Sequence, residues 1–287
     1  MRKHTMGLLA MAAATTLTLS ACGGAEVGGE PTDGATDGGA GGGDTIRIGI
    51  KYDQPGLGLQ DGDTFTGFDT DVARYVANEL GYSEDQIEWV ETISANRETA
   101  LQNDEVDMIF ATYSINDERK DLIDFAGPYF VAGQDLLVAA DNTDITGPED
   151  LEGKNLCSVT GSTSAENIKN DYAEGVQLVE RPGYADCATA LASGAVDAVT
   201  TDDIILAGLA ATEQNAGKFK VVGAPFSEER YGVGLPDGST DTCEEVNAAI
   251  TKMIEDGTWE ELVASNTEGA DYTANAELNP PEPDACA

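Results

Sequence analysis

The chain has 287 residues, and its 53 aspartates and glutamates outnumber its 15 lysines and arginines, giving a formal net charge of −38. This charge excludes nucleic acid and anionic lipid surfaces as electrostatic partners. The single histidine, His4, lies in an N-terminal segment that we expect to be removed. The remaining chain then lacks the residue that Ser-His-Asp catalysis and histidine metal sites require.

Residues 1–21 have the plan of a secretory signal peptide, with a positively charged start, a mostly apolar run and small residues at the end. The apolar run is too short, and too rich in alanine and threonine, for a comfortable membrane span. The last residues before Cys22 read LSA, which resembles a bacterial lipobox and implies lipidation of Cys22. The alternative is ordinary secretion with Cys22 as a free thiol.

Residues 22–44 then form a segment dominated by glycine, aspartate and threonine. Because this composition offers almost nothing to bury, it predicts a disordered linker behind the lipidated Cys22. About 240 residues remain, which suits one large domain or two modest ones.

Strand and helix patterns alternate from residue 45 onward. Strands are predicted at 45–52, 87–93 and 108–115, and helices at 67–81, at 94–107 and from Asp117. Ser94 and Asn116 are the expected caps of the second and third helices. This β-α-β-α-β-α order favours a mostly parallel sheet with helices on its faces.

A second α/β round begins near Gln134. Its strands are predicted at 135–141, 155–159, 176–182 and 196–202, and its helices at 162–173, 184–194 and 203–214. Two later helices, 242–257 and 258–266, fit as a return to the first unit. We therefore expect one lobe from 45–130 plus 231–287 and a second from 134–227. Two chain crossings would join the lobes, with a ligand cleft between them at the carboxyl ends of the strands.

Four cysteines remain after Cys22, and an even number in an exported chain indicates two disulfides with three possible pairings. The pairing Cys157–Cys187 with Cys243–Cys286 is favoured, because each pair then stays within one predicted lobe. These cysteines show no CxxC spacing, so we expect no metal site from them.

Five segments, in this order, carry a family resemblance: GFDTDVARYVANEL, ATYSINDERKDLIDFAGPYF, VTGSTSAENIK, AVDAVTTDD and YGVGLPDGS. They resemble the polar amino-acid-binding components of ABC uptake systems, the family 3 solute-binding proteins, over residues 45–266. YDQPGLG and ANRETALQNDEVDMIFATYSIN resemble Gram-positive glutamate-binding lipoproteins in particular. The resemblance implies an α/β, two-lobe, type II periplasmic-binding-protein-like fold with two hinge crossings.

Arg119 lies just past a predicted helix start, where its guanidinium can hold a ligand α-carboxylate through two parallel hydrogen bonds. The resemblance assigns this role to the arginine of the DER motif. The alternative is a surface pair with a neighbouring acid such as Asp117 or Asp121. On the facing lobe, the resemblance implies that the TGSTS turn binds the same carboxylate, through Ser162 and Thr163; the alternative there is helix capping.

The ligand ammonium needs acceptors, and Asp202 matches the family aspartate for this role. The carbonyl of Thr112 and the hydroxyl of Ser114 are expected to complete the shell around the ammonium and the carboxylate. A carboxylate that touches both lobes would make ligand binding close the cleft.

Selectivity for the ligand side chain depends on fewer residues. Arg97 matches an arginine that acidic-amino-acid binders place in the cleft; the alternative is a residue on a helix surface. Lys51 is a second candidate, on the same strand face as Asp53. Asp53 matches a position that contacts ligand side chains in some relatives, and here it is expected either to do so or to hold Lys51 or Arg97. These residues predict L-glutamate, with aspartate or glutamine as alternatives.

An EF-hand-like stretch at 61–72 is not expected to bind metal, because Phe65 and Val72 occupy ligand positions. We read this stretch as a loop that runs into a helix, and we expect no cofactor. The resulting hypothesis is a monomeric, lipid-anchored receptor on the extracellular face of the membrane that delivers an amino acid to an ABC permease. A ligand sensor and an enzyme on the same fold are the alternatives.

Overall fold

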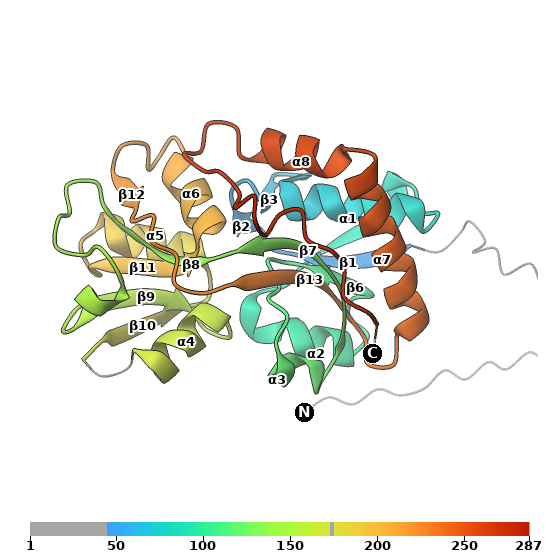
Figure 1. The fold of residues 1–287 in the computed structure, drawn as a ribbon, viewed down its shortest axis with the longest axis horizontal. Helices are drawn as coiled ribbons and strands as arrows, with labels where there is room; N and C mark the ends of the chain where they lie inside the picture. Colours follow the sequence, from blue (N-terminus) through green and yellow to red (C-terminus); the bar gives the residue numbers. More distant parts are fainter. Residues whose placement is uncertain (1–44, 173–174, 287) are drawn as a thin grey trace, which may run out of the picture. The chain divides into compact units, whose positions relative to one another are not determined.

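The computed structural model describes residues 45–172 and 175–286 (Figure 1). The predicted signal peptide, the lipidation site Cys22 and the linker up to residue 44 lie outside the described residues. In the described part of the chain, no helix is long and apolar enough to cross a membrane.

The elements follow one another along the chain as a mixture of strands and helices. The strands are β1 (Ile46–Ile50), β2 (Asp53–Gln54), β3 (Gly58–Asp61), β4 (Thr64–Thr66), β5 (Ile87–Glu91), β6 (Met108–Phe110), β7 (Asp124–Ala132), β8 (Gln134–Ala139), β9 (Asn155–Val159), β10 (Gln177–Arg181), β11 (Ala198–Asp202), β12 (Phe219–Val221) and β13 (Glu229–Leu235). The helices are α1 (Phe68–Glu79), α2 (Arg97–Gln102), α3 (Asp117–Lys120), α4 (Thr163–Asp171), α5 (Tyr184–Ala192), α6 (Asp203–Ala211), α7 (Thr240–Glu255) and α8 (Thr258–Asn266). Short 3₁₀ turns lie at Glu84–Gln86, Ser94–Asn96 and Pro148–Leu151.

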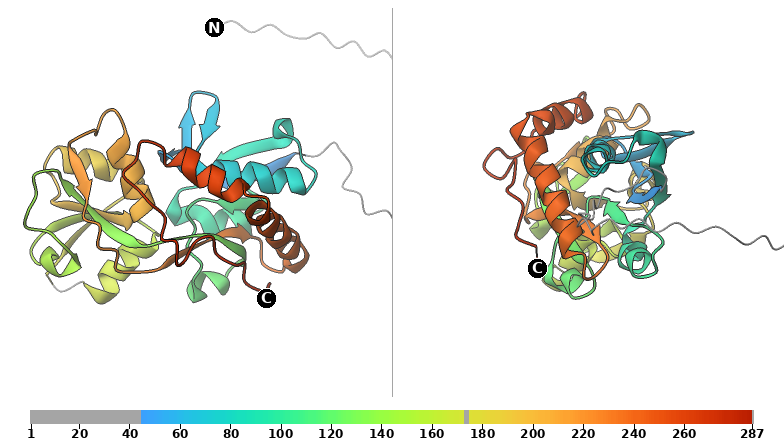
Figure 2. Two further views of the ribbon diagram at one scale, coloured as in Figure 1. Left: turned by 45° about the horizontal axis from the view of Figure 1, so that its top comes forward. Right: turned by 90° about the vertical axis from the view of Figure 1, so that its right-hand side faces the viewer.

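The first sheet has five strands in the order β5-β1-β6-β13-β7. β1 pairs in parallel with β5 and β6, whereas β13 pairs antiparallel with β6 and β7. Side chains of β6 alternate between two cores, because Met108 and Phe110 pack toward α1 while Ile109 packs toward α2. On the side of α1, helices α7 and α8 contact both α1 and each other (Figure 2).

The second sheet has five strands in the order β10-β9-β11-β8-β12. β9 pairs in parallel with β10 and β11, and β8 pairs antiparallel with β11 and β12. Leu136 and Val138 face the α4 side, whereas Leu137 lies in the core that contains α5 and α6 residues. Both sheets are therefore covered by helices on two faces, as alternating βα units require.

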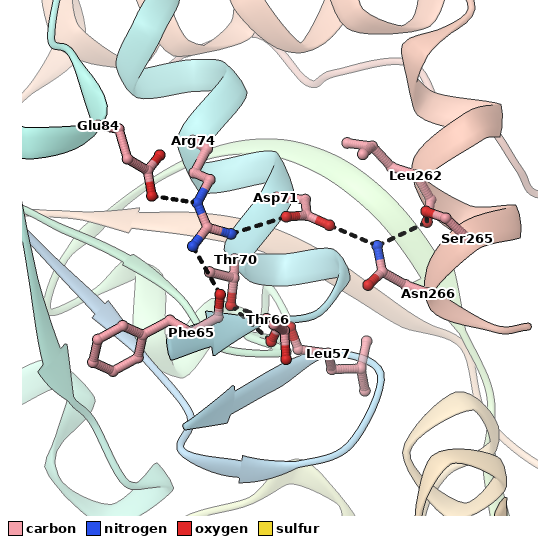
Figure 3. Close-up of polar contacts among 10 residues, drawn as sticks. All are labelled: Leu57, Phe65, Thr66, Thr70, Asp71, Arg74, Glu84, Leu262, Ser265 and Asn266. Carbon is pink, nitrogen blue, oxygen red and sulfur yellow. Dashed lines mark hydrogen bonds and ion pairs between the residues drawn. The ribbon is translucent and has the colours of Figure 1, made fainter. Parts of the chain in front are cut away.

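A small third sheet, β2-β3-β4, precedes α1. The sequence predicted a loop at 61–72, and this was wrong for residues 64–66, which form β4 and pair with β3. Arg74 secures this sheet to α1, since it binds Asp71 at 2.9 Å, Glu84 at 2.7 Å and the carbonyl of Phe65 at 2.8 Å (Figure 3). The other oxygen of Asp71 accepts from Asn266, which attaches the end of α8.

The chain passes between the two sheets along long strands. β7 of the first sheet leads through Gly133 into β8 of the second, and residues 222–228 return the chain from β12 to β13 (Figure 1). The C-terminal segment 267–286 makes further contacts that the sequence did not predict. Tyr272 donates to Asp203 of α6, and the side-chain amide of Asn279 pairs with both backbone groups of Val131 in β7.

Two disulfides fix the chain, Cys157–Cys187 between β9 and α5 and Cys243–Cys286 between α7 and the C-terminal segment. These are the two pairs that the sequence favoured among three possible pairings. The second pair brings the C-terminal segment back to α7.

Two local predictions need correction. Ser94 was expected to cap a helix, but it lies in a 3₁₀ turn, α2 begins at Arg97, and the Ser94 hydroxyl accepts from Lys51 instead. The strand predicted at 108–115 ends at Phe110, because Thr112 has a φ of 45° and therefore leaves the extended conformation. Asn116 caps α3 as predicted, since its side chain accepts from the Arg119 amide.

Candidate ligand-binding site

Three basic side chains, Lys51, Arg97 and Arg119, are buried beside the interface between elements of the two sheets. They are 4%, 2% and 7% exposed, in a chain where most acids and bases are solvated. Lys51 follows β1, Arg97 begins α2 and Arg119 lies in α3. We call these three residues the cation cluster.

The two guanidinium groups of the cluster converge on the same neighbours. Arg97 lies 4.0 Å and Arg119 5.0 Å from the centre of the Tyr113 ring, so both gain cation–π contact with one aromatic side chain. Both also donate to the carbonyl oxygen of Gly161, at 3.4 and 3.1 Å. Two donor groups therefore point at one position, which is the geometry that a carboxylate can use.

The partners of the cluster are mostly neutral. Arg97 donates to the carbonyl of Ala111 at 3.0 Å, and Arg119 donates to the carbonyl of Ser114 at 2.6 Å. Arg119 also pairs with Glu98, at 3.3 Å. Among the described residues, the Nε of Arg97 has no hydrogen-bond partner. The positive charge of the cluster is therefore only partly compensated.

Burial and mutual repulsion weaken the protonated forms of these groups. The pKa of Lys51 is lowered well below its usual range, first by burial and then by the charge of Arg97. The same two causes lower the pKa of Arg119 to about 10. Like charges held together away from water cost free energy, and an anion between them would recover part of that cost.

The turn that faces the cluster precedes α4 of the second sheet. Gly161 has a φ of 78°, and a Cβ at this position would lie 2.7 Å from the Cα of Ala95, so glycine allows the backbones to approach. Ser162 is the N-cap of α4, since its hydroxyl accepts from the Ala165 amide at 3.0 Å and donates to the Val159 carbonyl at 2.7 Å. The capping alternative therefore describes the Ser162 side chain.

Thr163, the first residue of α4, lies directly opposite Ser114. Their hydroxyl oxygens are 3.3 Å apart, and the Thr163 hydroxyl also donates to Glu229 at 2.8 Å. The structure thus brings Arg97, Ser114 and Arg119 together with the α4 turn.

Two buried acids lie beside the start of α4, where Glu229 accepts from Thr163 and Asp202 from Ser164. Asp202 ends β11 and Glu229 begins β13, and they are 3% and 4% exposed. Asp202 accepts from the Tyr231 hydroxyl at 2.6 Å. Burial, followed by the negative charge of Glu229, raises the pKa of Asp202 well above its ordinary value. We call Asp202 and Glu229 the acid pair, and a ligand ammonium would compensate their charge.

Asp53 and Lys51 hydrogen-bond to groups other than the Gly161 carbonyl. Asp53 accepts from the Ala185 amide at 3.4 Å, at the start of α5, and the Lys51 ammonium donates to Ser94 at 2.8 Å. Both residues line a cavity of ≈ 230 Å³ together with residues that follow β1 and β5 of the first sheet and residues of β9 and the start of α5: Tyr52, Glu91, Thr92, Ile93, Val159, Pro182, Gly183, Tyr184, Ala185 and Asp186. On the other flank, Thr163 and Glu229 line a cavity of ≈ 360 Å³.

Sequence reasoning missed several polar residues of this region, among them Gln54, Asp69, Glu229 and Tyr231. Gln54 is completely buried, accepts from Thr112, and its Nε2 has no partner among residues 45–172 and 175–286. A detectable signal existed for Asp69, because it falls on the same helical face as the apolar positions of α1. Glu229 and Tyr231 gave no such signal, since only the sheet pairing brings β13 to the site.

Residues 46–267 match the model of the bacterial extracellular solute-binding proteins, family 3. A glutamate-binding protein of Corynebacterium efficiens is 46% identical over 261 residues, which cover 87% of this chain and 86% of that protein. A glutamine-binding protein of an ABC transporter from Bacillus subtilis is 37% identical, covering 76% and 80%.

Among solved structures, an ancestral arginine-binding protein bound to arginine superposes with a TM-score of 0.70 and 34% identity, covering 77% of this chain and 97% of that one. The type II periplasmic-binding-protein fold that the sequence predicted is thereby confirmed. The chain belongs to family 3 of the bacterial extracellular solute-binding proteins.

Proposed function

We propose that this protein is the receptor of an amino-acid ABC importer and that its ligand is L-glutamate. The observation that carries the proposal is the cation cluster: three buried basic groups in a strongly acidic chain, of which Arg119 alone forms an ion pair with an acid of the described residues. Relatives that bind glutamate and glutamine support the amino-acid class of ligand. Two of the cluster's groups are guanidiniums, which suit a ligand with two carboxylates.

In the proposed pose, Arg119 holds the α-carboxylate, and the Ser114 and Thr163 hydroxyls and the turn at Ser162 complete its shell. Because the Ser162 hydroxyl already caps α4, we assign its share to the turn rather than to the side chain. The ammonium contacts Asp202 and the Thr112 carbonyl. The pose places the α-carboxylate and the ammonium of the amino acid between the cation cluster and the acid pair.

The side-chain carboxylate of the ligand is assigned to Arg97. Its guanidinium now donates to the carbonyls of Ala111 and Gly161, and a carboxylate would be a stronger acceptor than either. Lys51 and Asp53 are assigned to the outer part of this subsite. Lys51 adds positive charge, and Asp53 contacts the start of α5.

The proposed lobes are residues 45–130 plus 231–287 and residues 134–227, and closure of the cleft accompanies binding. Contacts that support closure join the two halves at three places: Arg119 to Gly161, Ser114 to Thr163, and Tyr231 to Asp202. A ligand that replaces or bridges these contacts would favour the closed arrangement over the open one.

The remaining parts of the proposal concern the protein's setting. We infer a monomer on the extracellular face of the membrane, anchored by a lipid on Cys22 and carried by a linker to residue 44. We infer an ABC permease as its partner and no catalytic activity of its own. In this proposal, the energy-consuming step of transport takes place on other polypeptides of the importer.

Isothermal titration calorimetry tests the ligand. Residues 23–287, with both disulfides oxidised and co-purified ligand removed, are titrated in parallel with L-glutamate, L-aspartate, L-glutamine and L-asparagine. The proposal predicts that glutamate binds most tightly. Tighter binding of glutamine would contradict the assigned ligand, and turnover of any of these compounds would contradict the receptor role.

A further inference from the structure

Asp69 lies in the first turn of α1 and is completely buried. Its Oδ2 accepts from the Thr112 amide at 2.8 Å, and its Oδ1 accepts from the Tyr129 hydroxyl at 2.7 Å. Each carboxylate oxygen therefore holds one donor from a different segment, the turn after β6 and the long strand β7.

The Thr112 amide belongs to an unusual piece of backbone. Thr112 has a φ of 45°, in the left-handed region that a β-branched residue adopts only under constraint. Something must hold this conformation, and the hydrogen bond from the Thr112 amide to Asp69 is buried and of good length.

The same turn holds Arg97. The guanidinium of Arg97 donates to the carbonyl of Ala111 at 3.0 Å and lies 3.5 Å from the carbonyl of Thr112. A change in the Thr112 conformation would move both of these carbonyls. The position of Arg97 therefore depends on a residue, Asp69, that is not a hydrogen-bond partner of Arg97 itself.

We propose that Asp69 is a positioning residue of the ligand site: its carboxylate holds Thr112 in the left-handed conformation and thereby places the Thr112 carbonyl and the Arg97 guanidinium for the ligand. This inference rests on the proposed function, because it takes Thr112 and Arg97 as ligand-binding groups. It adds a residue outside the expected ligand shell on which affinity depends.

The protonation of Asp69 gives this arrangement a measurable signature. Burial raises the pKa of Asp69 to about 6, although the bonds from Tyr129 and Thr112 and the charges of Lys51 and Arg97 oppose the rise. A protonated carboxyl is a weaker acceptor for the Thr112 amide than a carboxylate is. Affinity should therefore fall as the pH falls through about 6.

The first test is Asp69→Asn, which keeps the size of the side chain and removes its charge. At pH 7.5 we expect the dissociation constant for L-glutamate to rise about tenfold, as calorimetry measures it. Between pH 7.5 and pH 5 the wild-type affinity should fall more steeply than that of the variant, because only the wild type loses the Asp69 carboxylate. Equal affinities and equal pH profiles would overturn the inference.

Tyr129→Phe is the matched control, because it removes the other hydrogen bond of Asp69 and leaves the Thr112 bond in place. Since the Tyr129 hydroxyl lowers the pKa of Asp69, its loss should move the pH profile upward, while the affinity at pH 8 changes by less than about threefold. A tenfold loss of glutamate affinity at pH 8 in Tyr129→Phe would mean that affinity depends on the surroundings of the Asp69 side chain in general and not on its bond to Thr112.

A measurement without ligand separates this inference from the proposed function. The amide proton of Thr112, followed by ¹⁵N-resolved NMR, should shift with an apparent pKa of about 6 in the wild type, and this titration should be absent in Asp69→Asn. A Thr112 amide that does not titrate overturns the inference, whichever amino acid binds. Should glutamate fail to bind while the amide titrates, the ligand assignment fails, but the role of Asp69 in holding Thr112 stands.

If Asp69→Asn does not fold, the coupling is measured with Thr112→Gly and Asp69→Ala. Glycine adopts a positive φ without strain. Adding Thr112→Gly to Asp69→Ala should therefore restore part of the unfolding temperature that Asp69→Ala alone loses. Strictly additive effects of the two substitutions on the unfolding temperature would contradict the role of Asp69 in holding Thr112.

Discussion

The cation cluster and the acid pair carry opposite charges, and each is held by partners of a different kind. The cation cluster is built mainly on the first sheet and its helices, and its members bind neutral carbonyls and an aromatic ring. The acid pair lies at the end of β11 and the start of β13, and its members accept from the hydroxyls of Tyr231 and Thr163 and from the side-chain amide of Asn167.

This difference shows how one site can orient a zwitterion. The cluster keeps strong donors that no carboxylate among residues 45–172 and 175–286 fully satisfies, whereas the acid pair keeps two carboxylates that accept from hydroxyl and amide groups. In the proposed pose, the carboxylate of an amino acid lies against the cluster and its ammonium against the acid pair. Because the cluster contains two guanidiniums, that side should also decide which amino-acid side chain is preferred.

Removing Arg119 should cause the largest loss of glutamate affinity among substitutions in the cation cluster and the acid pair. Two charge-assisted hydrogen bonds are worth about 3 kcal/mol or more together, which corresponds to a loss of glutamate affinity of roughly a hundredfold in Arg119→Ala. Titration calorimetry measures this loss. Arg74→Gln is a matched control, because it also removes one positive charge but lies at the third sheet (Figure 3). Equal losses in the two variants would indicate a general charge effect and not a ligand contact.

Changing Arg97 should alter selectivity rather than all binding. In Arg97→Gln we expect glutamate affinity to fall by about ten- to a hundredfold and glutamine affinity by about threefold or less, since a neutral amide can pair with an amide but cannot compensate the charge of a carboxylate. Parallel titrations with the two ligands give the ratio. An unchanged glutamate affinity would remove Arg97 from the site.

Weakening the acid pair should have a smaller effect that depends on pH. Asp202→Asn should cost about tenfold in affinity at pH 8. Burial and Glu229 raise the pKa of Asp202, so in the wild type the ammonium-binding carboxylate is lost as the pH falls, and affinity should rise with pH. The variant should show a weaker rise. If both proteins had the same pH profile, Asp202 would not be the group that holds the ammonium.

Lys51→Met should have the smallest effect on affinity, about threefold, because Lys51 donates to Ser94 and not toward Gly161. Its pKa is lowered by burial in the folded protein, so the unfolded chain binds more protons and wild-type stability rises with pH between the folded and unfolded pKa values. The variant lacks this cost and should unfold about 2–4 °C higher at pH 7, as calorimetric scanning measures. A lower unfolding temperature would mean that the Lys51 charge stabilises the fold.

Much of the fold could be predicted because its signals are local. The apolar stripe of α1 and the Asn116 cap are read from neighbouring residues, and the alternation of βα units predicted the parallel strands of both sheets. The antiparallel strands β7, β12 and β13 were not predicted. The family resemblance gave the two-lobe arrangement and the candidate residues Arg119 and Asp202. These features depend on short stretches of chain, which a single sequence contains.

What was missed depends on contacts between distant segments. The 3₁₀ turn at Ser94 forms where Lys51 reaches it, 43 residues away. Glu229 reaches the site only because β13 pairs antiparallel with β7. The contact of Tyr272 with Asp203 likewise joins residues 69 apart. No local pattern records such pairings, so the sequence could not predict that these residues lie together.

A crystal structure of the protein with L-glutamate tests the central claim most directly. The account predicts that the α-carboxylate binds Arg119, the ammonium binds Asp202, and the side-chain carboxylate replaces the carbonyl of Gly161 or Ala111 as an acceptor for Arg97. A ligand bound in this cleft while Arg97 keeps all of its present partners would contradict the claim that the cation cluster sets the preference for glutamate.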